Sequence, residues 1–181
     1  MDDRYRLDGK VAVVTGCASG VGESVAKLFT ERGSKVLAVD VNADGLESAM
    51  EGVENVVTMP QDVTETNAAE KIIDAALENF GQVDILINNA GRVIYSEVHE
   101  LTDEIWNMHF DLNVGAAMRL CRRAIPELKK RPVGRIVNIG SAVTLRSSPG
   151  LAGYTASKHA LEGLTRVLSQ ELVPNITANC I

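Results

Sequence analysis

The sequence predicts an α/β fold, with one three-layer domain in which helices cover both faces of a parallel sheet of about six strands. Short runs rich in valine and isoleucine alternate with segments of helical periodicity from one end of the chain to the other. The apolar runs are nearly continuous, which is typical of parallel strands buried on both faces. This alternation predicts a single domain over residues 1–181 with right-handed crossovers.

Six runs have the length and composition of strands. They are residues 10–15, 34–40, 54–59, 82–88, 134–140 and 175–181. No internal repeat, low-complexity tract or linker separates them, so they are predicted to form one sheet.

The segments between these runs have helical periodicity, with apolar residues three and four positions apart. The clearest set is Ala69, Ile72, Ile73, Ala76, Leu77 and Phe80. A briefer set, Val21, Val25, Leu28 and Phe29, ends at Gly33, and another, Leu161, Leu164, Leu168 and Leu172, precedes Pro174. Residues 103–130 predict one long helix, or a helix bent near Gly115.

The charge balance argues against a nucleic-acid partner. The chain has 18 Lys and Arg against 24 Asp and Glu, a net charge of -6, so it has no basic excess to neutralise phosphates. The basic run at 129–132 is interpreted as a helix end, with a partner-binding patch as the alternative. No apolar run reaches membrane-spanning length and the first ten residues lack a signal-peptide core, so we expect a cytoplasmic protein with no membrane partner.

The cysteines and histidines do not predict a metal site. Cys17, Cys121 and Cys180 are far apart, and no Cys or His pair has ligand spacing, so we expect reduced, unpaired thiols. Cys17 lies in a glycine-rich loop, where we expect it to be accessible to oxidants. The histidines, His99, His109 and His159, are interpreted as structural or surface residues.

The glycine-rich loop "TGCASGVG" at 15–22 lies between the first predicted strand and a helix. Its glycines, Gly16, Gly20 and Gly22, permit a tight turn, close approach of a diphosphate to the backbone, and close packing of helix on strand. Free amides at the start of the helix would hold the phosphates. The pattern predicts a Rossmann-like, doubly wound sheet that binds a dinucleotide.

Asp40 ends the second predicted strand, 18 residues after Gly22. An acid at this place can accept hydrogen bonds from an adenosine ribose, and it would repel a 2′-phosphate. Residues 17–19 and 41–42 contain no Arg or Lys that would offset this repulsion. We therefore predict NAD rather than NADP, with a solvated carboxylate at a strand end as the alternative interpretation.

Tyr154 and Lys158 lie four residues apart, on one face of the last predicted helix. Small neighbours are expected to leave both side chains uncovered. A phenol has an ordinary pKa of about 10, and a cation one helical turn away stabilises the phenolate and lowers that pKa. Taken singly, the tyrosine would be an amphipathic residue and the lysine a solvated helix charge.

Several motifs in order make the chain resemble the short-chain dehydrogenase/reductase family, in its simple single-domain branch. They are "TGCASGVG" at 15–22, "QDV" at 61–63, "NNAG" at 88–91, "DLNVGA" at 111–116, "IGSAV" at 139–143 and "YTASK" at 154–158. The resemblance covers the whole chain. It implies hydride transfer between a nicotinamide cofactor and a secondary alcohol or ketone.

The resemblance also implies roles for single residues. Tyr154 would be the acid/base, Lys158 would tune it and bind the nicotinamide ribose, Ser141 would hold the substrate oxygen, and Asn113 would help hold a proton-carrying water. The implied cofactor-binding residues are Gly16, Ser19, Gly20, Val21, Gly22, Asp40, Asp62, Val63, Asn89, Ala90 and Gly91, with Tyr154 and Lys158.

Purely structural roles are the alternative for some of these residues. Asn113 would also suit a bend in a helix. Asp62 would equally cap a helix beginning near Thr64. Asn88 and Asn89 are expected either to bond backbone across a strand gap or to form a simple turn.

The sequence departs from the family pattern at its end. Family members continue beyond the sixth strand into a substrate-covering region, whereas this sequence stops at Ile181, so we interpret it as part of a longer chain. Leu145 and Arg146 are expected to border the substrate pocket. The resemblance implies a homodimer or homotetramer formed through the helices around 103–130 and 154–173. A catalytically weak dinucleotide-binding sensor or partner subunit is the second functional hypothesis.

Overall fold

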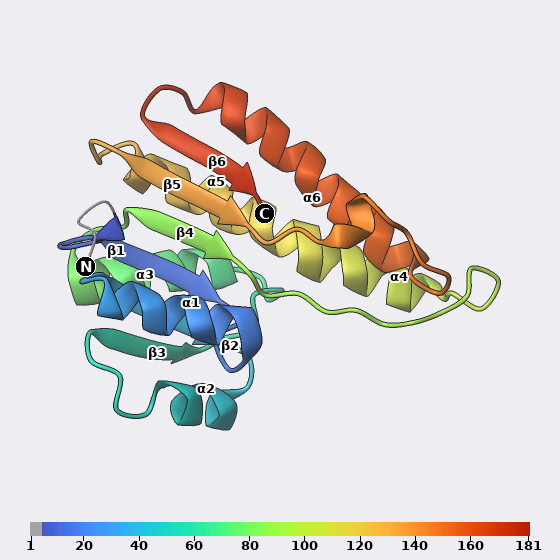
Figure 1. The fold of residues 1–181 in the computed structure, drawn as a ribbon, viewed down its shortest axis with the longest axis horizontal. Helices are drawn as coiled ribbons and strands as arrows, with labels where there is room; N and C mark the ends of the chain where they lie inside the picture. Colours follow the sequence, from blue (N-terminus) through green and yellow to red (C-terminus); the bar gives the residue numbers. More distant parts are fainter. Residues whose placement is uncertain (1–4) are drawn as a thin grey trace.

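The computed structural model describes residues 5–181, in which six parallel strands form one sheet with the order β3-β2-β1-β4-β5-β6 (Figure 1). The strands are β1 (Val11–Thr15), β2 (Lys35–Asp40), β3 (Val56–Pro60), β4 (Ile85–Asn88), β5 (Gly134–Asn138) and β6 (Ile176–Cys180). All six predicted strands and the doubly wound α/β class are confirmed, with small differences at the strand ends.

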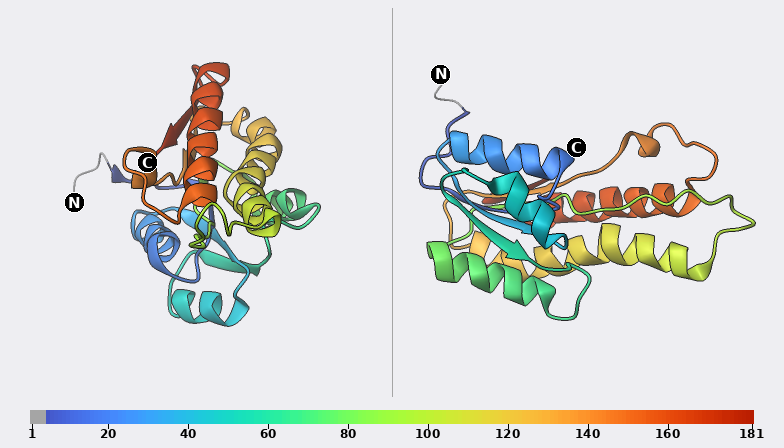
Figure 2. Two further views of the ribbon diagram at one scale, coloured as in Figure 1. Left: turned by 90° about the vertical axis from the view of Figure 1, so that its right-hand side faces the viewer. Right: turned by 90° about the horizontal axis from the view of Figure 1, so that it is seen from below.

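Helices lie on both sides of the sheet (Figure 2). They are α1 (Gly20–Glu31), α2 (Ala43–Met50), α3 (Ala68–Phe80), α4 (Asp103–Phe110), α5 (Ala116–Leu128) and α6 (Ala152–Glu171). A π-helix, η2 (Asp111–Gly115), joins α4 to α5, and a 3-10 turn, η3 (Ala142–Thr144), precedes α6. Within residues 5–181, no helix is both long and apolar enough to cross a membrane.

The central strands are buried on both faces, as predicted. Val13 and Leu37 pack with α3, α5 and α6, whereas Ala12, Val14 and Val36 belong to a second apolar cluster with α1 and α2. Alternate residues of one strand therefore contribute to two cores, because successive side chains point to opposite faces.

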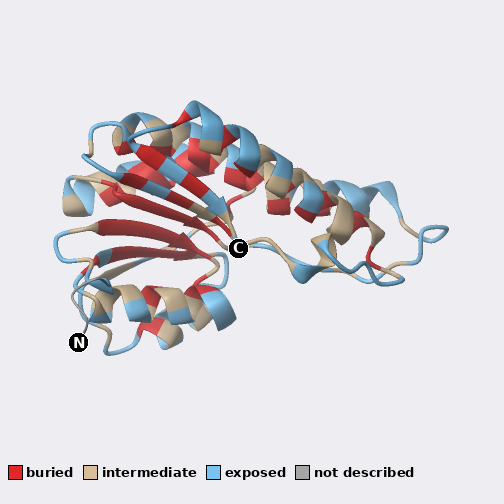
Figure 3. Cartoon of the chain, turned by 45° about the horizontal axis from the view of Figure 1, so that its top comes forward, coloured by how far each residue is buried: buried red, intermediate tan, exposed pale blue. Residues whose placement is uncertain are grey.

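The prediction of two-sided burial is wrong for β5 and β6 (Figure 3). Ile136 and Ile176 are buried, but their neighbours Arg135 and Thr177 are exposed. The helices α1 and α2 pack on β1, β2 and β3, so the same face of β5 and β6 is left without a described helix. The face toward α5 and α6 is covered, and on the other face Val137 of β5 is partly buried against the cluster of α1 and α2.

Three helical details differ from the sequence predictions. The short helix α2 was not predicted; Asn42 caps it by accepting a hydrogen bond from the Gly45 amide at 3.1 Å. The helix α3 begins at Ala68 rather than near Thr64. In α1, Val21 and Leu28 are exposed and the buried residues are the small Gly22 and Ala26.

The other helical predictions are confirmed. Leu161, Leu168 and Leu172 are buried, and α3 buries Ile72 and Ile73. The bend predicted near Gly115 is the π-helix η2, which inserts an irregular turn between α4 and α5.

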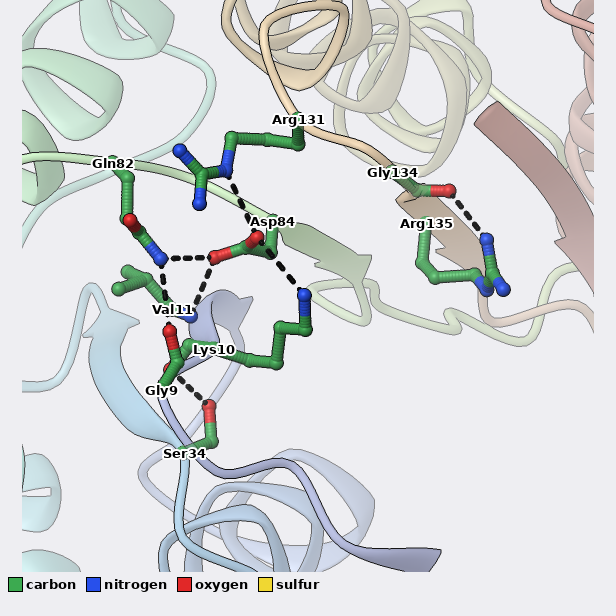
Figure 4. A network of polar contacts seen from close by, with 9 residues as sticks. All are labelled: Gly9, Lys10, Val11, Ser34, Gln82, Asp84, Arg131, Gly134 and Arg135. Atoms are coloured by element: carbon green, nitrogen blue, oxygen red, sulfur yellow. Dashed lines mark hydrogen bonds and ion pairs between the residues drawn. The ribbon is translucent and has the colours of Figure 1, made fainter. Parts of the chain in front are cut away.

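A buried carboxylate ties the amino ends of the strands together (Figure 4). Asp84, which is 1% exposed, accepts hydrogen bonds from the Val11 amide at 3.0 Å and from Gln82 Nε2 at 2.7 Å. Arg131 Nε lies 3.1 Å and Lys10 Nζ 3.6 Å from its other oxygen. The basic run at 129–132 therefore follows the end of α5 and also supplies a cation to this network.

Candidate active site

The main candidate cleft lies at the carboxyl ends of β1 and β4, where the strand order reverses. Open α/β sheets bind ligands at such a switch point. The cleft has a volume of about 600 Å³ and is lined by Gly16, Asp40, Val41, Gln61, Asp62, Val63, Thr64, Ala90, Gly91, Arg92, Met108, Asp111 and Leu112. Six of the predicted cofactor-binding residues are in this lining: Gly16, Asp40, Asp62, Val63, Ala90 and Gly91.

Asp40 holds the glycine loop in addition to lining the cleft. Its Oδ2 accepts a hydrogen bond from the Ala18 amide at 2.9 Å, and its Oδ1 accepts one from the Asn42 amide at 2.9 Å. A carboxylate offers about four acceptor positions, so two remain for a ligand. The loop is further fixed because the amides of Gly16 and Cys17 both donate to the Val39 carbonyl.

The glycines of the loop have different roles. A Cβ on Gly22 would lie 2.0 Å from the Gly16 carbonyl oxygen, so only glycine permits the observed contact between α1 and the loop. Gly20 has a φ of +62° and a Cβ there would meet nothing within 4 Å, so it faces open space. Ser19 precedes α1 without a side-chain cap, which leaves the first amides of α1 free of a capping side chain.

Thr15 and Asn89 join the two strands beside the cleft, and the role of Thr15 was not predicted from the sequence. The Thr15 Oγ1 accepts hydrogen bonds from the amides of Asn89 and Ala90, each at 3.0 Å. Asn89 Nδ2 donates to the Thr15 carbonyl at 2.9 Å and the Gly16 carbonyl at 3.1 Å. Asn89 therefore bonds backbone across the gap between β4 and β1, as one of the two interpretations predicted. Its bond to the Gly16 carbonyl holds the start of the glycine loop.

A second buried polar chain was not predicted: Asn88, expected to bond backbone or to form a simple turn, ends β4 and bonds side chains instead. Asn88 Nδ2 donates to Asn138 Oδ1 at 2.7 Å, and Asn138 Nδ2 donates to Thr165 Oγ1 at 2.8 Å. These residues link β4, β5 and α6 directly beneath the site. The signal in the sequence was a polar residue ending an apolar run, which occurs in "ILIN" and "GRIVN".

Asp62 closes a tight turn at the far end of the cleft. Its Oδ1 accepts hydrogen bonds from the Thr64 amide at 2.8 Å and from Thr64 Oγ1 at 2.7 Å. Because α3 begins only at Ala68, the alternative that Asp62 caps this helix is wrong. The carboxylate lines the cleft beside Val63.

Lys158 is buried against Tyr154 and the end of β5. Its Nζ donates a hydrogen bond to the Ile139 carbonyl at 2.7 Å and lies 5.7 Å from the centroid of the Tyr154 ring. The lysine is 4% exposed, so the expectation that it is uncovered is wrong, whereas Tyr154 is half-buried. Burial lowers the pKa of the Lys158 ammonium.

Asn113 lies in the π-helix and fixes the chain that follows Gly91. Its Oδ1 accepts from the Arg92 amide at 3.0 Å, and its Nδ2 donates to the Arg92 carbonyl at 3.2 Å and to Ser157 Oγ at 3.0 Å. A Cβ on Gly91 would lie 3.1 Å from Asn113 Oδ1 and 3.6 Å from Lys158 Nζ. The side chains of Asn113 and Lys158 therefore meet at Gly91, on the wall of the cleft.

Ser141 lies two residues after the carbonyl that holds Lys158. Its Oγ accepts a hydrogen bond from the Val143 amide at 3.3 Å and caps η3. It lines a second hollow of about 590 Å³, together with Leu145, Glu162, Arg166 and Cys180 among others. No hydrogen bond joins Ser141 to Tyr154 within residues 5–181. Leu145 is 87% exposed.

Comparison with known proteins identifies the family of this chain. A sequence profile for short chain dehydrogenases matches residues 10–181. The 3-oxoacyl-acyl-carrier-protein reductase of Thermotoga maritima is 30% identical, with 97% of this chain and 74% of the reductase covered. The chain belongs to the short-chain dehydrogenase family.

Two further proteins show how far the similarity extends. Zerumbone synthase of Zingiber zerumbet is 36% identical over 97% of this chain and 68% of the synthase. A crystal structure of a Sinorhizobium meliloti protein assigned as a short-chain alcohol dehydrogenase superposes with a TM-score of 0.92 at 30% identity, covering 97% of this chain and 72% of that one. This short-chain dehydrogenase is therefore an oxidoreductase of a family that uses nicotinamide dinucleotides.

The cleft of this short-chain dehydrogenase fits such a dinucleotide. The exposed residues at the start of α1, Ser19, Gly20 and Val21, leave amides and the positive end of the helix dipole open to a diphosphate. Asp40 retains acceptor capacity for a ribose, and Gly91 leaves room beside Lys158. Gly22 and Asn89 act differently, since they shape the loop rather than line the cleft.

None of the cysteines and histidines lines the main cleft of this short-chain dehydrogenase. All three cysteines are free, as predicted, but the expectation that Cys17 is accessible is wrong: it is fully buried, its Sγ donates to the Val14 carbonyl, and burial raises its pKa to about 12. His109 is buried and accepts a hydrogen bond from the Ile94 amide, so it is structural. His99 and His159 are exposed. Residues 5–181 hold no cluster of His, Cys, Asp or Glu suited to a metal ion.

Proposed function

We propose that this short-chain dehydrogenase transfers a hydride between NAD(H) and a secondary alcohol or ketone. The observation that carries the proposal is the buried ammonium of Lys158, 5.7 Å from the ring centroid of the half-buried Tyr154 and beside the cleft wall at Gly91. A protein that only binds a dinucleotide has no need of a phenol beside a buried cation.

The proton chemistry is assigned to Tyr154. Bound NAD would accept the hydride from the alcohol carbon, and the hydroxyl of that alcohol must then lose its proton. The Tyr154 oxygen takes this proton, or returns it in the reverse direction. Tyr154 lies in the first turn of α6, and the Lys158 ammonium is 5.7 Å from the centroid of its ring.

Ser141 and Asn113 are assigned supporting roles. Because Ser141 Oγ already accepts from the Val143 amide, its own hydroxyl proton is free to be donated to the substrate oxygen. The Asn113 amide is engaged by Arg92 and Ser157, so its side chain positions Gly91 against α6. Its participation in holding a proton-carrying water stays a prediction.

NAD is proposed over NADP because of Asp40. Its charge, near the site assigned to the adenosine ribose, would repel a 2′-phosphate, and Val41 beside it in the cleft lining has no charge to offset this. The assembly as a homodimer or homotetramer and the cytoplasmic location stay predictions. Light scattering tests the first, and fractionation of cells that produce the protein tests the second.

The test is a hydride-transfer assay with NAD and a panel of secondary alcohols carrying deuterium on the reacting carbon. We expect deuterium to appear in the reduced nicotinamide for at least one alcohol of the panel. Tight NAD binding without label transfer from any alcohol, or from the reduced cofactor to any ketone, would instead support the sensor or partner-subunit hypothesis.

A further inference from the structure

The segment after the cleft, residues 92–96, is not part of the sheet, yet every second residue of it is anchored. Asn113 binds both the amide and the carbonyl of Arg92. The Ile94 amide donates to His109 Nε2 at 3.1 Å, and the Ser96 amide donates to the Gly150 carbonyl at 2.9 Å. The segment is thus bonded along one edge like a strand, to a π-helix, to α4 and to the turn that leads into α6.

The middle anchor, His109, also packs on the residue assigned to catalysis. Its ring is fully buried, and the centroid lies 6.2 Å from that of the Tyr154 ring, edge-on at 61°. A Cβ on Gly153 would lie 2.8 Å from His109 Nδ1, so the imidazole occupies the space that a side chain at 153 would need. One ring therefore contacts both the anchored segment and the first turn of α6.

This arrangement requires a neutral imidazole. Nε2 accepts the Ile94 proton, so the ring proton is on Nδ1, which is buried and has no hydrogen-bond partner among residues 5–181. Burial lowers the pKa of His109, and the Ile105 carbonyl partly opposes that shift. Among the described residues no charged side chain contributes to this shift, and Tyr154 is the titratable group whose ring faces the imidazole.

We propose that His109 is a positioning residue for Tyr154, acting as the acceptor that holds residues 92–96 and as the packing surface that fixes the phenol. The proposal rests on the assignment of Tyr154 as the acid/base. Loss of the acceptor leaves the Ile94 amide without a partner in the fold, so the segment opens and the phenol gains freedom. The expected consequence is a lower kcat, because alignment of the proton acceptor is lost, while the KM for NAD stays nearly unchanged.

The test compares His109→Leu with His109→Gln, since glutamine can place an acceptor oxygen near the position of Nε2. Hydrogen exchange of the intact protein, read in peptides that span residues 92–96, is the readout. We expect exchange to quicken by roughly tenfold in the leucine variant and to stay slow in the glutamine variant. Equal exchange in the wild type and the leucine variant would overturn the proposal.

A second experiment tests the same contact without replacing His109, in case the His109 variants fold poorly. Gly153→Ala keeps the histidine but places a methyl group where the ring lies, so we expect the same faster exchange and the same fall in kcat. In the His109→Ala background, the same glycine change should add little further effect. Additive effects of the two changes would contradict a shared site.

Kinetics of Tyr154→Phe separate this proposal from the assigned function. If the phenylalanine variant is inactive and the leucine variant of His109 has wild-type kcat, the positioning role is wrong and the function stands. If the phenylalanine variant keeps full activity, the assignment of Tyr154 is wrong, and with it the positioning role, whatever hydrogen exchange shows of the anchor.

Discussion

Lys158 Nζ lies 5.7 Å from the centroid of the Tyr154 ring and is held there by the Ile139 carbonyl at 2.7 Å. The lysine is one helical turn from the tyrosine, and Ile139 directly follows the last residue of β5. The ammonium is therefore fixed between a strand end and the phenol. The proposed dual role of this cation, toward the phenol and toward a cofactor beside Gly91, depends on that fixed position.

The contact between Gly22 and Gly16 predicts a specific stability loss. Gly22→Ala places a methyl group 2.0 Å from the Gly16 carbonyl oxygen, so the loop or α1 must move. We expect the free energy of unfolding to fall by roughly 2 kcal/mol. Gly163→Ala is the matched control, because a Cβ there meets nothing within 4 Å and alanine favours the helix by about 1 kcal/mol. Chemical denaturation measures both, and equal effects of the two changes would refute the packing argument.

The Asp84 network predicts a second stability effect, at the end of the sheet opposite the site. Asp84→Asn keeps the shape but removes the charge that faces Arg131 and Lys10, and it turns one acceptor into a donor. We expect a loss of about 2 kcal/mol in the free energy of unfolding. Asp74→Asn removes one exposed partner of Arg123 and should cost less than about 1 kcal/mol. A wild-type unfolding midpoint for Asp84→Asn would contradict the role of the network.

Asp40 predicts the cofactor preference. Asp40→Ala combined with Val41→Arg removes the negative charge and adds a positive one in the cleft lining, so affinity for NADP should rise relative to NAD by tenfold or more, about 1.4 kcal/mol. Asp40→Asn is the control for loss of the loop contact: it removes the charge, but its amide oxygen can still accept from the Ala18 amide. Titration with each cofactor measures the ratio. An unchanged ratio of NADP to NAD affinity in the double variant would show that Asp40 does not set the cofactor preference.

His109 predicts how stability depends on pH. Its pKa is lowered in the folded protein, so the unfolded chain binds more protons as pH falls through the ordinary imidazole pKa of about 6.5. The wild type should therefore lose stability relative to His109→Gln below that pH, by at most about 1.4 kcal/mol per pH unit, and the difference should be constant above pH 8. Denaturation at several pH values tests this, and parallel pH curves for the two proteins would be the contrary result.

The sequence predicted features that depend on local spacing. The apolar runs identified the strands, the glycine loop and Asp40 identified the cleft, and the four-residue interval placed Tyr154 beside Lys158. Each of these follows from the period of a strand or helix, or from a motif within a few residues. The burial of β5 and β6 could not be read in this way, because it depends on which helices lie above each strand.

The supporting contacts escaped prediction because they join distant positions. Thr15 meets Asn89, and His109 meets Gly153, across 74 residues and 44 residues respectively. Thr15 and Asn89 each lie within a motif, but nothing in either motif indicates that the two residues bond each other. In the folded chain they determine where the glycine loop and the phenol lie, so the structure was needed to identify them.

The central claim is that the Tyr154 hydroxyl carries the proton in a hydride transfer. The most direct measurement is the turnover number of Tyr154→Phe with NAD and a secondary alcohol that the wild type oxidises, alongside its NAD dissociation constant. We expect turnover to fall by at least about 100-fold, because the proton acceptor is lost, with the dissociation constant changed by less than about threefold. Full turnover in the phenylalanine variant would show that another group carries the proton and would contradict the account.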